Sequence, residues 1–169
     1  MPQDFIGRVT GLLHRGQRRE PFEIPLFPLK TVLFPGTLLP LKIFEPRYME
    51  MVSACLQHKN PFGVCLILEG EETGKPAKHV ETGCIAEINE WDMPQLGILQ
   101  IQALGTERFH IEDFHIESNG LIIASATYVA PEPAQALPAN HHACATLLQR
   151  LIEHLGEARF KPPLNYNDS

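Results

Sequence analysis

Proline breaks up an apolar stretch near the start of the chain, and this feature limits the possible folds more than any other. The stretch covers residues 21–44, and its prolines are Pro21, Pro25, Pro28, Pro35 and Pro40. Proline has no backbone N–H to donate, so this stretch cannot form one regular central strand of a sheet. The sequence therefore predicts two short strands, residues 23–29 and 38–44, with a corner between them.

The corner is predicted at Phe34, Pro35, Gly36 and Thr37. Proline presets φ at the first central position of a β-turn. Glycine takes the positive φ that the second central position of a type II turn requires. The order of these residues is therefore typical of a type II turn.

A helix is predicted directly after the second strand. Pro46 suits the first turn of a helix, where the missing N–H costs nothing. Met49, Val52 and Leu56 then follow at helical spacing. The pattern indicates a helix over residues 46–58 with these three side chains on its inner face.

The rest of the chain up to residue 130 is predicted to be mostly β. A charged, Gly- and Pro-containing loop is expected at residues 69–79. The alternation of apolar and polar residues changes phase at Glu112–Asp113, which indicates a bulge, and Asn119–Gly120 favours a hairpin turn. The expected strands are residues 62–68, 84–90, 99–103, 109–116 and 121–129.

Four segments follow from these patterns. Residues 1–20 form a basic leader whose apolar residues recur at helical spacing, and a loosely ordered leader is favoured over a surface-seeking helix because three glycines weaken such a helix. Residues 21–130 form a β domain containing helix 46–58, and residues 131–139 form a Pro/Ala linker. Residues 140–169 form a C-terminal helix and tail.

The C-terminal helix has the clearest periodicity in the chain, with Asn140 as the expected N-cap and Gly156 just beyond its end. Its expected apolar stripe is Cys144, Leu147, Leu148, Leu151, Ile152 and Leu155.

Charge and composition disfavour several classes of protein. The net charge is −6, and because residues 1–20 carry +2, the remainder carries −8, which is a poor surface for nucleic acid. No apolar stretch approaches the ~18 residues of a membrane span, and basic residues interrupt any signal peptide. The four cysteines lack metal-site or disulfide spacing, so buried reduced thiols in a cytoplasmic protein are expected.

Motifs for catalysis, cofactor binding and metal binding are missing from the sequence. Residues 70–76 resemble a phosphate-binding loop, but Pro76 replaces the Ser or Thr that would hold Mg²⁺. No serine lies in a G-x-S-x-G context. His141, His142 and His154 do not have the spacing of metal ligands on a helix. On these motifs alone we expect no enzyme, no cofactor and no metal. A Cys/His pair that comes together only in the folded chain stays an open alternative.

Two places could carry binding. Glu45 lies between an apolar strand and a helix start, and we interpret it as structural, either at the helix N-terminus or as a partner of Arg47 or of a backbone amide. Trp91, Met93 and Leu96 lie in a segment predicted to be a turn. They are candidate anchors for a protein partner, and the alternative is that Trp91 folds back over one end of the barrel.

These motifs together resemble the Lon N-terminal (substrate-binding) domain family, with its stand-alone bacterial members. The resemblance covers residues 22–155. It rests on residues 24–29, 32–36, 39–41 and 83–88 and, most specifically, on Phe44, Glu45, Pro46, Arg47 and Tyr48 and on Gly105, Arg108 and Phe109. With Phe34, Pro35 and Gly36, these motif residues are expected to be mainly structural.

The resemblance implies an α+β fold, a PUA-like pseudo-barrel of mixed strands with an inserted helix and a C-terminal helix. It also implies a non-catalytic module that binds exposed apolar or unfolded polypeptide, without the ATPase and protease of Lon, whose motifs are missing from this sequence. A separate protease or chaperone is a conceivable partner. The alternative is a PUA-like binder of a small ligand or modified nucleic acid, a weaker inference because one fold hosts many functions.

Two features depart from the family pattern. The basic leader has no counterpart in it, and the chain ends after residues 165–169, where stand-alone members continue into further helices. We therefore expect a C-terminal part that is truncated relative to the family. The apolar stripe of the last helix would then lack its cover and favour self-association.

Overall fold

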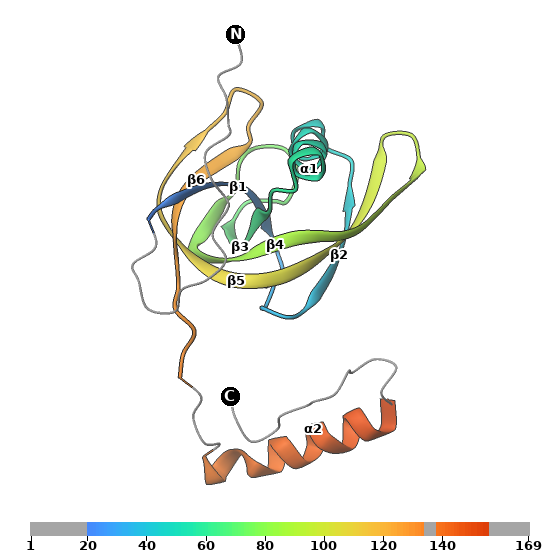
Figure 1. The fold of residues 1–169 in the computed structure, drawn as a ribbon, viewed down its shortest axis with the longest axis vertical. Coiled ribbons are helices and arrows are strands. Elements are labelled where there is room, and N and C mark those ends of the chain that lie inside the picture. Colours follow the sequence, from blue (N-terminus) through green and yellow to red (C-terminus); the bar gives the residue numbers. More distant parts are fainter. Residues whose placement is uncertain (1–19, 134–137, 156–169) are drawn as a thin grey trace. The chain divides into compact units, whose positions relative to one another are not determined.

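Six strands and two α-helices make up the computed structural model, which describes residues 20–133 and 138–155 (Figure 1). The strands are β1 Phe22–Leu29, β2 Leu38–Ile43, β3 Phe62–Glu69, β4 Lys78–Gln95, β5 Ile98–Ile116 and β6 Ile122–Tyr128. The helices are α1 Pro46–His58 and α2 His142–Leu155, the latter preceded by a 3₁₀ turn, Ala139–His141. The chain is therefore an α+β protein, as predicted.

Five of the strands close into a ring. β1 pairs with β3 and β6, β3 with β4, β4 with β5, and β5 with β6, while β2 joins the ring from outside through β5. The β1–β3 pair is parallel and the other pairs are antiparallel. The expected pseudo-barrel of mixed strands is thus confirmed.

The proline-rich stretch forms two strands and a tight turn, as predicted. β1 pairs first with β6 and then with β3, and the change occurs at Leu26. Gly36 has φ +78°, and the N–H of Thr37 donates to the carbonyl of Phe34 over 3.1 Å. The positive φ at the second central residue identifies the type II turn.

α1 begins at Pro46 and ends where Lys59 takes a left-handed conformation with φ 54°. Its buried side chains include Met51, Val52 and Cys55, whereas the predicted inner residues Met49 and Leu56 are only partly buried. The inner face is therefore turned toward Met51 and Cys55, because the helix packs against the ring with that side.

Two hydrophobic cores lie on the two faces of β1, β3 and β4. Core 1 lies under α1 and β2, and core 2 lies under β6 and the second half of β5. Neighbouring residues alternate between them, so that Leu26 belongs to core 2 and Phe27 to core 1. Because residues 24–29 of β1 and 62–67 of β3 lie between the two cores, their sequences are apolar without interruption.

β4 and β5 are much longer than predicted and form one hairpin with its turn at Leu96–Gly97. Register shifts interrupt their pairing, and a further shift between Ile111 and Asp113 confirms the predicted bulge. Bulges bend a strand without ending it, which is why the sequence pattern changed phase where the strand continued. The predicted hairpin turn at Asn119–Gly120 is present, and Gly120 has φ +85°.

Residues 131–169 cluster as a second unit, of which α2 is the described helix. α2 starts at His142 after the 3₁₀ turn, so the predicted N-cap at Asn140 is wrong, because this residue lies inside that turn. The predicted leader up to residue 19, part of the linker and the tail after residue 155 lie outside the described residues.

Candidate functional site

The β4–β5 hairpin extends beyond the closed ring. The last residue of β4 that pairs with β3 is Ala86, and from there outward β4 pairs only with β5. β2 lies on the other side of β5. We call residues 87–104 the arm, a part of the hairpin that projects past the ring next to α1 (Figure 1).

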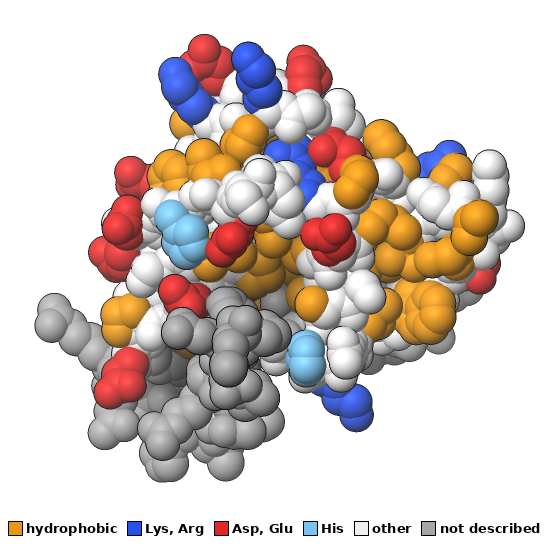
Figure 2. All heavy atoms as spheres, turned by 90° about the horizontal axis from the view of Figure 1, so that it is seen from above, with side chains coloured by type: hydrophobic (Ala, Val, Ile, Leu, Met, Phe, Trp, Pro, Cys, Tyr) orange, Lys and Arg blue, Asp and Glu red, His pale blue; other side chains and the backbone are white. Residues whose placement is uncertain are grey.

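The three predicted anchor residues all lie on the arm with exposed side chains. Trp91 is 59% exposed, Met93 44% and Leu96 94%. Trp91 pairs with the buried Ile101, and a residue opposite its partner points to the same face of a sheet. The apolar surface of the arm therefore continues core 1 outward. Figure 2 shows hydrophobic side chains gathered on the side toward which the arm extends in Figure 1.

The structure changes the predicted setting of these residues. Trp91 and Met93 belong to β4, and only Leu96 lies in a turn. With 59% of its surface exposed, Trp91 does not cover an end of the barrel. The sequence signal for a strand was present, because acidic and apolar residues alternate from Glu90 to Met93.

The opposite face of the arm carries the polar side chains Glu90, Asp92, Gln100 and Gln102, which alternate along the strands with Trp91 and Ile101. A shallow depression of about 380 Å³ at this part of the arm is lined by these six residues and by Pro40, Leu41 and Lys42 of β2. Sequence analysis did not single out the two carboxylates, because their position beside an unpaired strand edge follows only from the pairing of β4.

The type II turn and Gly105 hold each other in place. The Gly36 N–H donates to the Gly105 carbonyl over 2.8 Å, and the Gly105 N–H donates to the Thr37 carbonyl over 2.9 Å. A Cβ atom at Gly105 would lie 2.3 Å from the carbonyl oxygen of Phe34. Only glycine fits there. The ring of Phe34 is itself largely exposed, so its part of the motif does not pack into the core.

Arg47 is the central residue of the motif at the start of α1. It is buried, its Nε lies 3.1 Å from a Glu45 carboxylate oxygen, and its Nη1 donates to the Gly120 carbonyl over 3.0 Å. The other Glu45 oxygen accepts from the Gly74 N–H over 3.2 Å. Glu45 thus has both structural partners named as alternatives in the sequence analysis, Arg47 and a backbone amide.

Tyr48 completes this cluster. The Arg47 guanidinium lies 4.5 Å from the centroid of the Tyr48 ring, which stacks on Phe27 at 4.0 Å. Burial raises the pKa of Tyr48 to about 12, and the nearby Arg47 opposes the shift. Phe44, in contrast, is exposed directly after β2 and differs from the expectation of a structural role.

Phe109 fills the narrowest part of core 2. Its ring is fully buried, and a Cβ atom at Gly63 or Gly83 would lie 2.7 or 2.4 Å from Phe109 Cζ. Both glycines therefore make room for the ring. The neighbouring Arg108 donates from Nη2 to the Ala130 carbonyl over 3.3 Å and accepts from the Val129 N–H at its own carbonyl.

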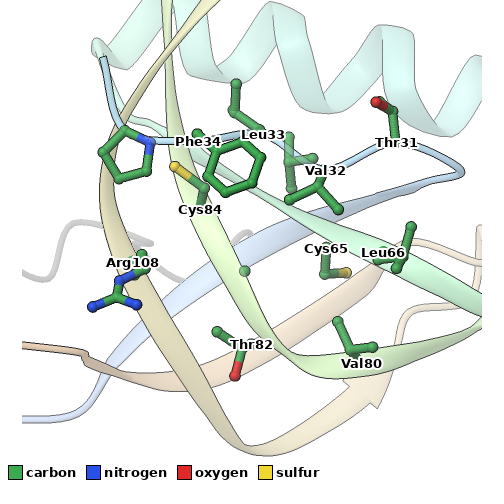
Figure 3. A pocket seen from close by; sticks show the side chains of 13 residues that line it. Thr31, Val32, Leu33, Phe34, Cys65, Leu66, Val80, Thr82, Cys84 and Arg108 are labelled. Carbon is green, nitrogen blue, oxygen red and sulfur yellow. The ribbon is translucent and has the colours of Figure 1, made fainter. Parts of the chain in front are cut away.

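An apolar groove of about 240 Å³ lies beside the type II turn (Figure 3). Val32 and Phe34 form one side, Val80 and Thr82 lie across from them, and Arg108 stands at one end. Its volume is below the ~300 Å³ at which small-molecule pockets begin. The groove is thus small for a small-molecule ligand.

The buried thiols are held in their unreactive form. Burial raises the pKa of Cys55 to about 11 and that of Cys65 to about 12, and it also raises the pKa of Cys84. Because the thiolate is the nucleophile, these three groups are inert at neutral pH. Cys144, which was predicted to pack, is exposed on α2.

Among residues 20–133 and 138–155, no group of three His, Cys, Asp or Glu side chains is placed to hold a metal ion. None of the described helices combines the length and the apolar character that crossing a bilayer requires.

The fold and motifs have counterparts in known proteins. A solved Lon N-terminal domain protein from Xanthomonas campestris is 33% identical, with a TM-score of 0.66, over 77% of this chain and 73% of its own. The N-terminal domain of a Mycobacterium avium complex Lon protease shares the fold, with a TM-score of 0.57 at 15% identity, over 82% of this chain and 69% of its own.

Sequence relatives point the same way. The cereblon proteins of Danio rerio and Gallus gallus are 29% and 27% identical over 68% and 69% of this chain. The chain spans 28% and 25% of their lengths, about a quarter. Residues 23–168 match the family described as the ATP-dependent protease La (LON) substrate-binding domain. The chain therefore belongs to the Lon substrate-binding domain family.

Proposed function

We propose that this protein is a non-catalytic module that binds exposed apolar or unfolded polypeptide through the arm. The observation that carries the proposal is the exposure of Trp91, Met93 and Leu96 on a hairpin that also forms part of the ring. Large apolar side chains on a well-supported surface are typical anchors of protein interfaces. The family description, a substrate-binding domain, supports the same function.

Other properties of the molecule support a binding role without chemistry. The inert thiols of Cys55, Cys65 and Cys84 disfavour a cysteine nucleophile and fit a reducing compartment, so we place the protein in the cytoplasm. A separate protease or chaperone would receive the bound polypeptide. The alternative, a binder of a small ligand or modified nucleic acid, is less well supported, because the 240 Å³ groove is small, the 380 Å³ depression is shallow and the body is acidic.

A binding experiment with an unfolded protein tests the proposal. The probe is a fluorescently labelled test protein, reduced and capped at its cysteines so that it cannot refold. We expect saturable binding in the micromolar range, and we expect Trp91→Ala combined with Met93→Ala to weaken it about tenfold or more. Anisotropy titration measures both.

Leu68 provides the matched control. It is 67% exposed but lies on β3, away from the arm. Leu68→Ala should leave the affinity unchanged. Equal losses from the control and from the arm variants, or no saturable binding by the unaltered protein, would show that the arm is not a binding surface.

A further inference from the structure

The outer edge of β4 in the arm lacks a partner strand. β3 ends its pairing at Ala86, and no described strand pairs with β4 from Glu87 to Gln95 on the side away from β5. Unpaired backbone groups at a strand edge are a template for another extended chain. The arm therefore offers backbone hydrogen bonds in addition to its apolar side chains.

The register shows which backbone groups face this edge. Gly105 directs its N–H and C=O to the turn that precedes β2. Orientation alternates along a strand, so Gln102 and Gln100 direct theirs to β4, where they pair with Glu90 and Asp92. Trp91, between these two residues, therefore turns its N–H and C=O toward the free edge.

The side chains along this edge differ between the two faces. Trp91 and Met93 lie on the apolar face, which continues core 1, and Glu90 and Asp92 lie on the polar face. Within residues 20–133 and 138–155, neither carboxylate forms an ion pair with another side chain. A strand that pairs with Trp91 places alternate side chains opposite the apolar residues and opposite the acids.

The outer edge of β2, which flanks the arm on the other side of β5, is protected from pairing. On β2, Leu38, Pro40 and Lys42 occupy the positions whose backbone faces away from β5, by the same alternation. Pro40 has no N–H to donate there, and Lys42 adds a charge. Proline and lysine are the usual devices that keep edge strands from pairing. On β4, Pro94 and the register shifts lie on either side of residues 90–92, and these three residues themselves carry neither proline nor lysine, so the β4 edge is open around Trp91.

We propose that the β4 edge of the arm binds an extended segment of another polypeptide as an added strand, with Lys or Arg on both sides of an apolar residue. The apolar residue lies opposite Trp91, and the two basic residues lie opposite Glu90 and Asp92. A second copy of the same edge is disfavoured, because a two-fold pairing centred on Trp91 sets Glu90 against Asp92 of the copy, and like charges directly opposite repel. This inference rests on the proposed function and specifies its substrate.

The first test uses the full chain and a nine-residue peptide in which valine alternates with lysine. We expect it to bind about tenfold more tightly than a peptide of the same composition with its lysines in one block, and more tightly still than the valine–glutamate version. Methylation of alternate amide nitrogens, which keeps the charge but removes the donors, should abolish binding. Equal affinities for the alternating, block and methylated peptides overturn strand addition.

Charge reversal on the protein gives the complementary result. Glu90→Lys combined with Asp92→Lys should invert the preference, so that the valine–glutamate peptide binds more tightly than the lysine peptide. The control, Glu23→Lys combined with Glu81→Lys, makes the same change in net charge at exposed positions of β1 and β4 within the ring. An equal inversion in the control would mean that net charge alone directs binding, which contradicts the proposal.

Amide hydrogen exchange separates edge pairing from contact with the apolar face. With the alternating peptide bound, the Trp91 amide should exchange at least tenfold more slowly, because it then donates to the peptide. Unchanged exchange at Trp91 despite saturating peptide contradicts the inference. If the unfolded test protein still binds through Trp91 in that case, the proposed function stands and strand addition alone fails. If the unfolded protein does not bind at all, the proposed function fails.

Discussion

β4 and β5 run through both the ring and the arm, but their side chains are buried to different extents in the two regions. In the ring, β4 has β3 on one edge and β5 on the other, and Phe109 of β5 is fully buried. In the arm, β4 has β5 alone, and Trp91 is mostly exposed. An apolar side chain on these strands therefore stabilises the fold or remains available for binding according to how many neighbours its strand has.

This comparison separates the effects expected of substitutions. Replacements in the ring and in the motif around Arg47 should reduce stability. Replacements of the exposed apolar residues of the arm, Trp91, Met93 and Leu96, should leave stability almost unchanged and affect binding instead.

Phe109→Ala should lower the free energy of unfolding by about 3–5 kcal/mol, because it empties the space that Gly63 and Gly83 leave for the ring. Urea denaturation followed by circular dichroism measures the change. The control is Phe114→Ala, which truncates a half-exposed ring on the same strand and should cost below ~1 kcal/mol. Similar losses for both variants would contradict the assignment of Phe109 to a tightly packed core.

Arg47→Ala should lower the free energy of unfolding by about 3 kcal/mol, since it leaves the Glu45 carboxylate without its cation and the Gly120 carbonyl without its donor. The same denaturation experiment applies. Arg47→Lys keeps the charge but loses the planar group that reaches both partners, so an intermediate loss is expected. If the lysine variant is as stable as the unaltered protein, charge alone accounts for the role of Arg47.

Raising the pH should destabilise the fold through the buried thiols of Cys55 on α1 and Cys65 on β3. In the unfolded chain these thiols ionise near pH 9.0, whereas burial raises the pKa of Cys55 to about 11 and that of Cys65 to about 12. Above pH 9 the folded state therefore binds more protons than the unfolded state, so stability falls as pH rises. Each thiol contributes about 1 kcal/mol of loss at pH 10 and nothing below pH 8.

Urea denaturation in the presence of a reductant at pH 7.5, 9 and 10 checks this dependence. Cys65→Ala provides the comparison, because its stability should fall less steeply between pH 9 and pH 10 even though it starts from a lower value. Parallel slopes for the two proteins would show that Cys65 does not retain its proton in the folded state.

Trp91→Ala should change the free energy of unfolding by less than ~0.5 kcal/mol, because the side chain is mostly exposed. Circular dichroism must report this unfolding, since Trp91 is the only tryptophan of the chain. In the unaltered protein, acrylamide should quench the tryptophan emission nearly as well as it does in urea. Strong protection from the quencher would mean that part of the chain covers the arm.

Much of the fold could be predicted from the sequence, because its signals are local. Pro35 and Gly36 specify a turn through their allowed φ values, and Pro46 specifies the first turn of a helix. The length of β4 and β5 was not predicted, because their bulges shift the alternation while pairing continues across them. Asn140 was misread as a cap because a 3₁₀ turn before α2 uses the same kind of residue.

The candidate site was predicted only in part. Trp91, Met93 and Leu96 are conspicuous in sequence because large apolar residues flank a glycine and a proline. Their common surface and the free edge beside Glu90 and Asp92 depend on where β3 stops pairing with β4. That is a long-range property of the sheet, and no short segment of sequence encodes it.

Closure of the ring depends on its last strand. β6 pairs with β1 at one side and with β5 at the other, and it is the last strand among residues 20–133 and 138–155. During synthesis from the N-terminus, the edges of β1 and of the second half of β5 that pair with β6 therefore stay unpaired until about residue 128 has left the ribosome exit tunnel. Exposed strand edges in such a nascent intermediate invite aggregation. Ribosome-associated chaperones are thus most needed until β6 has emerged and can pair with both strands.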